Sequence, residues 1–274
     1  MTLRRTKSGF SEIYLSLLDN LPLVLQMIRR EVVGRYRGSL FGLLWSFFNP
    51  VLMLTVYTFV FSMVFKSRWG QGNDNRYGFA LTLFAGLIVF NLFSECVSRA
   101  PGLILSNVNY VKKVIFPLEI LPWVSLGSSL FHACVSLAVL LVFLLLLGMP
   151  LSWTVLLLPA VVLPLLPLIM GITWLLASVG VFVRDIGQFI GLAMTVLMFM
   201  SPIFYPVSAL PESVRGYLFL NPMTFIIEQT REVLIFDRVP NLGGLAIYSC
   251  ISVLVAWAGL SWFQKTRKGF ADVL

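Results

Sequence analysis

The chain has 274 residues, of which 58% are hydrophobic, with a mean hydropathy of +0.91 and a formal net charge of +8. This composition excludes an ordinary soluble globular protein. A positive charge of this size occurs in both nucleic-acid-binding proteins and membrane proteins, and its distribution along the chain, described below, favours the second class.

Six long apolar runs predict an all-α, polytopic membrane protein with six transmembrane helices in one domain, residues 43–263. A helix needs about 20 apolar residues to cross the hydrocarbon core of a bilayer, and each run is near that length or longer. The predicted spans cover residues 43–65, 79–97, 120–147, 153–183, 186–205 and 242–263.

Residues 1–42 precede the first span and are predicted to contain an amphipathic helix at residues 11–37. Apolar residues recur there at helical spacing, and Pro22 is expected to break or bend the helix. We expect the helix to lie along the membrane interface, either as an anchor that orients the chain or as a docking surface for a cytoplasmic partner. The segment has no apolar core followed by a small-residue cleavage site, so a signal peptide is not expected.

The connections on the same side as this segment are short or helical. Within residues 98–119, Pro101 and Asn107 are placed to begin and end a short helix, which the basic pair Lys112–Lys113 follows. Such a helix suits contact with a partner, although many loops of this kind only join two spans. Arg184–Asp185 makes up nearly the whole connection between spans four and five.

Two short re-entrant or interfacial helices are predicted between spans five and six, within residues 206–241. Residues 208–219 can form the first, and Asn221–Pro222 is a typical start for the second, because a capping side chain is followed by proline in the first turn. The run Met223–Phe236 is too apolar for a solvated loop and too short and charged to span a bilayer. These helices are expected over the outer mouth of any pathway.

The second short helix carries three charged residues, Glu228, Arg231 and Glu232, within one helical turn. Glu228 and Arg231 have the i, i+3 spacing of an ion pair. Near a lipid interface such a pair can hold a short helix in place.

Lysine and arginine indicate the orientation. Seven of the 20 precede the first span, seven more lie in the connections and tail on the same side, and six lie on the other side together with five carboxylates. By the positive-inside rule both termini, including the tail 264–274, are cytoplasmic. The net charge is therefore a topology signal, and no nucleic-acid partner is expected.

The six apolar runs contain one carboxylate, Glu95, one histidine, His132, and no lysine or arginine. Proton- or ion-driven transporters normally keep ionisable groups inside their spans. The energy for any transport is therefore expected from outside these spans. His132 is interpreted as a hydrogen-bonding residue in helix packing rather than as a ligand or proton relay.

Aromatic residues are concentrated in the first span. Tyr57, Phe61 and Phe65 recur every four residues and therefore share one helix face. Aromatic faces can stack on the C–H surfaces of sugar rings, so this face can line a channel for a glycan. Contact with lipid and with the membrane interface is the alternative, and Trp45 fits it well.

No motif indicates chemistry in this chain. The phosphate-binding pattern G-x-x-x-x-G-K-[ST] is absent, as are H-E-x-x-H and G-x-S-x-G. The chain has three cysteines, Cys96, Cys134 and Cys250. They lie in or beside apolar runs and lack the spacing of a zinc site, so we expect them to be inert thiols. We expect a transport subunit that is not an enzyme and binds no metal or cofactor.

Several segments together resemble the membrane subunit of type-2 ABC exporters for lipid-linked polysaccharides, the O-antigen and teichoic-acid transporters. They occur in family order from residue 35 to the C-terminus, and jointly they are specific. The segments are R-Y-R-G-S-L-F-G-L-L-W-S-F-F-N-P at 35–50, N-Y-V-K-K-V-I-F-P-L-E-I-L-P at 109–122, G-V-F-V-R-D at 180–185, S-P-I-F-Y at 201–205, N-P-M-T-F-I-I-E-Q-T-R at 221–231 and F-A-D-V-L at 270–274.

The resemblance implies a homodimer in the bacterial inner (plasma) membrane, bound to two copies of a separate ATPase subunit that carries ATP and Mg. It also implies an undecaprenyl-linked polysaccharide substrate and a channel between protomers. The implied aromatic lining is Trp45, Phe48, Tyr57, Phe61 and Phe65. The implied outer gate is Pro202, Asn221, Pro222, Glu228, Arg231 and Glu232. The implied ATPase contacts are Arg29, Arg30, Arg35, Arg37, Asn107, Lys112, Lys113, Arg184 and Asp185.

An exporter of O-antigen fits best, with a teichoic-acid or capsular polysaccharide exporter as the alternative within the family. Two other classes stay open. An ion-coupled secondary transporter would depend on Glu95 and His132. A membrane-embedded glycan enzyme would need catalytic carboxylates at the outer face, where the candidates are Asp74, Glu212, Glu228, Glu232 and Asp237.

Overall fold

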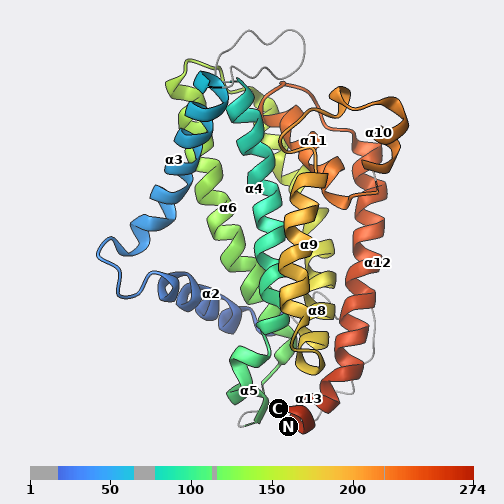
Figure 1. Ribbon diagram of the computed structural model, residues 1–274. Helices are drawn as coiled ribbons and strands as arrows, with labels where there is room; N and C mark the ends of the chain where they lie inside the picture. The colour runs from blue at the N-terminus through green and yellow to red at the C-terminus, as the bar shows by residue number, and fades with distance from the viewer. Residues whose placement is uncertain (1–17, 65–77, 113–115, 219) are drawn as a thin grey trace.

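The computed structural model describes residues 18–64, 78–112, 116–218 and 220–274, and in these ranges the chain forms helices and no strands. Five helices are long and apolar enough to cross a membrane, and a sixth apolar helix, Ile186–Met200, is shorter. Figure 1 shows these helices side by side in one bundle. The predicted all-α, multi-pass membrane fold is confirmed.

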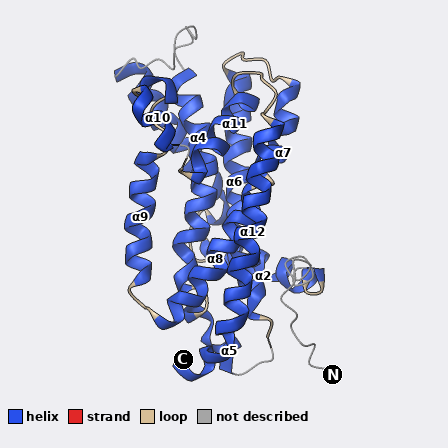
Figure 2. Ribbon diagram, turned by 90° about the vertical axis from the view of Figure 1, so that its right-hand side faces the viewer, coloured by secondary structure: helices blue, strands red, loops and turns tan. Residues whose placement is uncertain are grey.

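The helices are numbered in chain order and carry the labels of Figures 1 and 2. Their bounds are α2 Leu21–Arg35, α3 Trp45–Tyr57, α4 Gly78–Arg99, α5 Val108–Lys112, α6 Leu121–Leu146, α7 Leu158–Val162, α8 Leu165–Phe182, α9 Ile186–Met200, α10 Glu212–Leu218, α11 Pro222–Leu234, α12 Leu242–Thr266 and α13 Phe270–Val273. A π-helical segment, Thr58–Val64, extends α3.

Helix α4 forms the centre of the bundle. Its apolar stretch is 83% buried, against 11% for the stretch that contains α3 and 22% for the one that contains α6. It contacts α3, α6, α8, α9 and α11. Side chains at both ends of the bundle therefore have α4 as a neighbour.

Helices α8 and α12 make the closest packing in the bundle, and two glycines allow it. A Cβ added to Gly259 would lie 2.1 Å from the carbonyl oxygen of Gly171, and one added to Gly171 would lie 2.4 Å from the carbonyl oxygen of Val255. Small residues at a helix–helix contact let the backbones approach in this way.

Helix α9 ends earlier than the predicted span at residues 186–205. Ser201 is extended, with φ −87° and ψ 147°, because the ring of Pro202 disfavours helical geometry in the residue before it. The 15 helical residues measure about 22 Å, against a hydrocarbon core of about 30 Å. Five helices are therefore of full length, and a non-helical turn follows the sixth.

Helix α2 lies across one end of the bundle and projects from the side opposite to α9 (Figures 1 and 2). The predicted break at Pro22 falls at its first turn, where a missing N–H breaks no helical hydrogen bond. It packs on α6, where a Cβ at Gly127 would lie 2.2 Å from Ile28. Residues 11–17 of the predicted helix lie outside the described residues.

Candidate functional site

Arg231 of α11 is the most deeply buried cation in the described part of the chain, with 1% of its surface exposed. Its guanidinium donates hydrogen bonds to three backbone carbonyl oxygens on other segments. Nε donates to Thr82 at 3.0 Å, Nη1 to Pro202 at 2.5 Å and Nη2 to Ile203 at 3.0 Å. One side chain therefore joins α11 both to α4 and to the turn that follows α9.

Glu228 supplies the counter-charge for this guanidinium. Its Oε1 accepts a hydrogen bond from Arg231 Nη1 at 2.9 Å, which confirms the predicted i, i+3 pair. Burial raises the pKa of the Glu228 carboxyl, and the charge of Arg231 opposes that shift. Since Arg231 is buried, the pair differs from a weak surface ion pair. Removing either partner leaves the charge of the other without a counter-charge in an apolar environment.

Gly86 on α4 makes space for Arg231. A Cβ at this position would lie 2.8 Å from Arg231 Nη2 and 3.2 Å from the side chain of Ile227. Neither Gly86 nor the Thr82 carbonyl belongs to the residues predicted from sequence. The only sequence signal was Gly86 itself, because a glycine in the middle of an apolar run can mark a place where another group approaches the backbone closely.

Asn221 joins the end of α9 to the start of α11. Its Nδ2 donates to Ser201 Oγ at 2.9 Å, and its Oδ1 accepts from the backbone N–H of Met223 at 2.9 Å as an N-cap. Pro222 occupies the first position of α11, which confirms the predicted helix start. We refer to Asn221, Glu228 and Arg231, with the carbonyl groups that Arg231 binds, as the α11 latch.

The structure thus brings five of the six predicted gate residues into one cluster and leaves one outside it. Glu232 is partly buried and pairs with the exposed Arg238, with Oε2 and Nη1 3.6 Å apart. Of the carboxylates considered for an enzyme, Glu228 and Glu232 are ion-paired, Glu212 and Asp237 are exposed, and Asp74 lies outside the described residues.

The predicted ATPase contacts gather at the opposite end of the bundle, where α2, α5 and the α8–α9 connection lie (Figure 1). Most of them are on the surface, and Lys113 lies outside the described residues. Arg30 donates to the Tyr110 hydroxyl at 3.1 Å, which links α2 to α5. Asn107 donates to the Leu103 carbonyl group at 2.9 Å. Arg30 and Arg35 are exposed despite their partners, and the other exposed members of the set are Arg29, Arg37, Lys112, Arg184 and Asp185.

Arg35 differs from the other predicted contacts because its guanidinium pairs with Glu95 of α4. Arg99 also approaches Glu95, with Nη1 and Oε1 3.6 Å apart, and pairs with Glu31 of α2. Two arginines and two glutamates therefore alternate across the contact between α2 and α4. The carboxylate that stood alone in the apolar runs of the sequence has two cationic partners.

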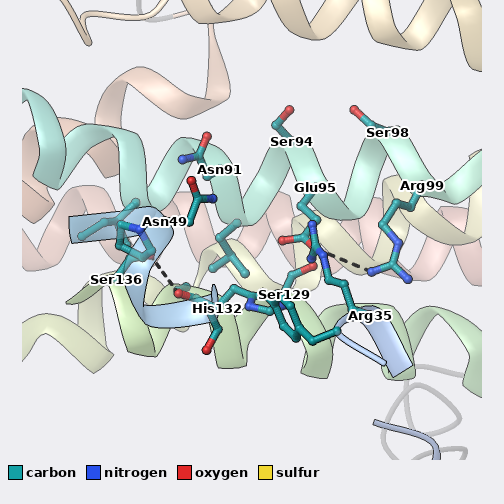
Figure 3. Close-up of a pocket in the computed structure, with 16 residues that line it drawn as sticks. Arg35, Asn49, Asn91, Ser94, Glu95, Ser98, Arg99, Ser129, His132 and Ser136 are labelled. Atoms are coloured by element: carbon teal, nitrogen blue, oxygen red, sulfur yellow. Dashed lines mark hydrogen bonds and ion pairs between the residues drawn. The ribbon is translucent and has the colours of Figure 1, made fainter. Parts of the chain in front are cut away.

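A polar pocket of about 430 Å³ lies beside this ion-pair cluster, between the α2–α3 region, α4 and α6 (Figure 3). Its walls include the two asparagines Asn49 and Asn91, as well as Tyr36, Ser129 and His132. Burial raises the pKa of the Tyr36 phenol, so its hydroxyl stays protonated at neutral pH. Sequence reasoning singled out His132 and Glu95 but did not bring them to a pocket.

His132 does not play the predicted hydrogen-bonding role through its Nε2 atom. This atom is buried and has no hydrogen-bond partner among the described residues. The imidazole ring instead meets the rings of Tyr36 and Phe131 edge-on, with centroids 6.0 and 5.5 Å away.

The predicted aromatic lining divides into two groups. Tyr57 and Phe61 are half-buried, and the ring of Phe61 lies 5.1 Å from that of Phe79 on α4. Trp45 and Phe48 are exposed near the other end of α3, where their ring centroids are 6.3 Å apart. Phe65 lies outside the described residues. The aromatic lining therefore stays a prediction, with its two groups in different surroundings.

Comparison with known proteins adds a second line of observation. Residues 22–235 match the model of the ABC-2 type transporter family. The chain is 31% identical over 252 residues to the O-antigen export system permease protein RfbA of Myxococcus xanthus, covering 91% of this chain and 94% of that protein. It is 26% identical over 254 residues to RfbA of Klebsiella pneumoniae, with coverage of 92% and 95%. The polysialic acid transport protein KpsM of Escherichia coli is 22% identical over 244 residues, with coverage of 84% and 88%.

Proposed function

Because this chain belongs to the ABC-2 type transporter family, we propose that it is the permease subunit of an ATP-driven exporter of lipid-linked O-antigen polysaccharide. In this proposal two copies form the membrane body, and two copies of a separate ATPase subunit bind ATP and Mg. The complex resides in the bacterial inner membrane with both termini cytoplasmic. The observation that carries the proposal is the 31% identity to an O-antigen export permease over 91% of the chain.

The exposed basic end of the bundle supports an ATPase partner. Helices α2 and α5 and the α8–α9 connection present side chains there that have no role in the core, among them Arg29, Arg37 and Arg184. The link between Arg30 and Tyr110 would let α2 and α5 receive one ATPase subunit as a unit. The apolar spans then need no energy-coupling residue of their own.

The α11 latch supports a gate at the opposite end. Arg231 ties α11 to α4 and to the turn after α9 through three hydrogen bonds, and a fourth joins it to Glu228 on α11 itself. A buried cation with discrete carbonyl partners can hold two helices in one arrangement until its hydrogen bonds are broken together. Glycan passage would require α11 to move as a unit.

The pairing of Glu95 weighs against an ion-coupled secondary transporter. A carboxylate that carries ions must exchange its partners during transport, whereas Glu95 is already engaged in ion pairs with two arginines of the same chain. In this proposal, Glu95 positions α2 against α4. Capsular polysaccharide stays the alternative substrate within the family, because one relative is a polysialic acid transport protein.

Complementation tests the proposal. This chain and a candidate ATPase subunit from the same organism would be expressed together in strains lacking either their O-antigen permease or their capsule permease. Surface O-antigen, scored with antiserum on intact cells, should return in the first strain and capsule should stay absent in the second. Return of capsule alone would reassign the substrate, and return of neither would contradict a polysaccharide exporter.

A further inference from the structure

The polar pocket is an exception within an apolar bundle. Asn49 of α3, Asn91 of α4 and His132 of α6 face one cavity of about 430 Å³ (Figure 3). That volume is within the range of small-molecule sites. Polar side chains within transmembrane segments are costly, and they commonly line a substrate path or a water-filled cavity.

Two groups in this pocket lack a good partner. His132 Nε2 is buried without a hydrogen bond among the described residues. The hydroxyl of Ser129, a residue that is 1% exposed, has only the weakly polar thiol of Cys96 beside it. Buried polar groups are normally satisfied, so both atoms point to an occupant that donates and accepts hydrogen bonds.

The charges around the pocket indicate an uncharged occupant. Arg35 and Arg99 are matched by Glu31 and Glu95, which they contact directly. A phosphate or diphosphate would have to compete with these carboxylates for the guanidinium groups. A hydroxyl-rich molecule would leave these pairs intact, since each hydroxyl can donate to His132 Nε2 and accept from an asparagine amide.

Aromatic surface adjoins the pocket. The ring of Tyr36 forms one wall, and Trp45 and Phe48 flank the α3 residues Ser46 and Asn49 that line the opening. Trp45 is 41% exposed and Phe48 is 42% exposed, and the two rings meet Phe41 and each other edge-on, so part of their surface is open to a sugar ring. The polar groups in the pocket can bind the hydroxyl groups of a pyranose, and the aromatic rings beside it can contact its C–H surface.

We propose that this pocket is a binding subsite for one or two uncharged sugar residues of the exported glycan, held by Asn49, Asn91, Ser129 and His132. The inference rests on the proposed function for the origin of the sugar. It adds a subsite at the basic end, at the level of Glu95, that a glycan chain occupies before it reaches the α11 latch.

Saturation-transfer NMR on the full complex in lipid nanodiscs tests this subsite, because the method detects millimolar sugar binding. The probes are oligosaccharides released from the O-antigen and from the capsule of the source strain. The variant Asn91→Leu/His132→Phe removes two hydrogen-bonding groups at nearly constant volume. Thr55→Val on α3 is the matched control, since the Thr55 hydroxyl only bonds the Val51 carbonyl group of its own helix.

The subsite predicts binding of at least one oligosaccharide, at least a tenfold loss of signal in the double variant and an unchanged signal in Thr55→Val. Inorganic pyrophosphate should not displace the sugar. Full binding by the double variant, displacement by pyrophosphate or no binding by the wild-type complex would each overturn the inference. Pocket-dependent binding alongside failed complementation would keep the subsite and overturn the proposed exporter function instead.

Discussion

Gly86 of α4 and Arg231 of α11 pack against each other so closely that a Cβ added to the glycine would lie only 2.8 Å from the arginine Nη2. The contact places a guanidinium inside a largely apolar bundle, where three carbonyl groups and one carboxylate surround it. The short helix α11 is therefore attached to the central helix by a buried side chain that is held by several hydrogen bonds.

Replacing Gly86 with leucine is expected to push Arg231 out of its site. We expect the apparent free energy of unfolding in mild detergent to fall by about 3 kcal/mol, since the guanidinium loses its carbonyl partners while buried. Gly191→Leu on α9 is the control, because nothing lies within 4 Å of its Cβ position. Equal unfolding energies for the two variants would show that Gly86 has no special packing role.

Removing Arg231 itself should be more damaging than removing its exposed counterpart. Arg231→Met is expected to cost about 3–5 kcal/mol of stability, because Glu228 and the carbonyl groups are left unpaired. Arg238→Met changes a side chain that is 72% exposed and is expected to cost under about 1 kcal/mol. Chemical denaturation of both proteins measures the difference, and a similar loss in each would contradict the latch.

The ion pair between Arg35 and Glu95 is expected to hold α2 against α4, a structural role distinct from contact with an ATPase. Arg35→Glu should weaken the contact between α2 and α4, and Glu95→Arg in the same chain should restore part of it. Since Arg35 is 49% exposed, we expect a coupling of only about 0.5–1 kcal/mol in a double-mutant cycle. A coupling of zero would mean that the pair does not hold α2.

Arg37 is exposed and is expected to act on the ATPase instead. Arg37→Glu should leave the free energy of unfolding unchanged and lower glycan-stimulated ATP hydrolysis by the assembled complex, because it reverses charge on the docking surface. Assembly with the ATPase, followed by pull-down, is the companion measurement. Normal assembly and hydrolysis would limit α2 to the role of a membrane anchor.

Much of the fold followed from patterns that depend on neighbouring residues. The apolar runs predicted the helices, Asn221 and Pro222 predicted the start of α11, and helical spacing predicted the pair of Glu228 with Arg231. Each of these features is local. The Ser201–Pro202 step also carried a local signal for the early end of α9, which the apolar composition of residues 186–205 outweighed.

The remaining features depend on contacts between distant segments. The partner of Arg35 lies 60 residues away in the sequence, and the Thr82 carbonyl group lies 149 residues from Arg231. Arg35 looked like a surface contact because its neighbours Arg29, Arg30 and Arg37 are basic as well. Backbone carbonyl acceptors have no sequence signature, so the surroundings of Arg231 became visible only in the folded chain.

The aromatic residues of α3 should divide into two functional groups. Tyr57→Ala and Phe61→Ala are expected to lower stability, since the Phe61 ring packs on Phe79 of α4 and the Tyr57 ring packs on Phe61. Trp45→Ala and Phe48→Ala should preserve stability and weaken stimulation of the ATPase by glycan, because these rings are exposed. Unfolding and ATPase assays on the same preparations distinguish the groups. Unaltered stimulation in the second pair would favour lipid contact for Trp45 and Phe48.

Transport by the purified complex in proteoliposomes is the most direct measurement of the central claim. Lipid-linked O-antigen would be supplied on the ATPase side, and its appearance in the lumen would be followed by protection from an added glycosidase. We predict ATP-dependent protection that disappears when the ATPase subunit is omitted or made catalytically inactive. Protection that persists without the ATPase, or that follows an imposed proton gradient, would contradict ATP-driven export through this chain.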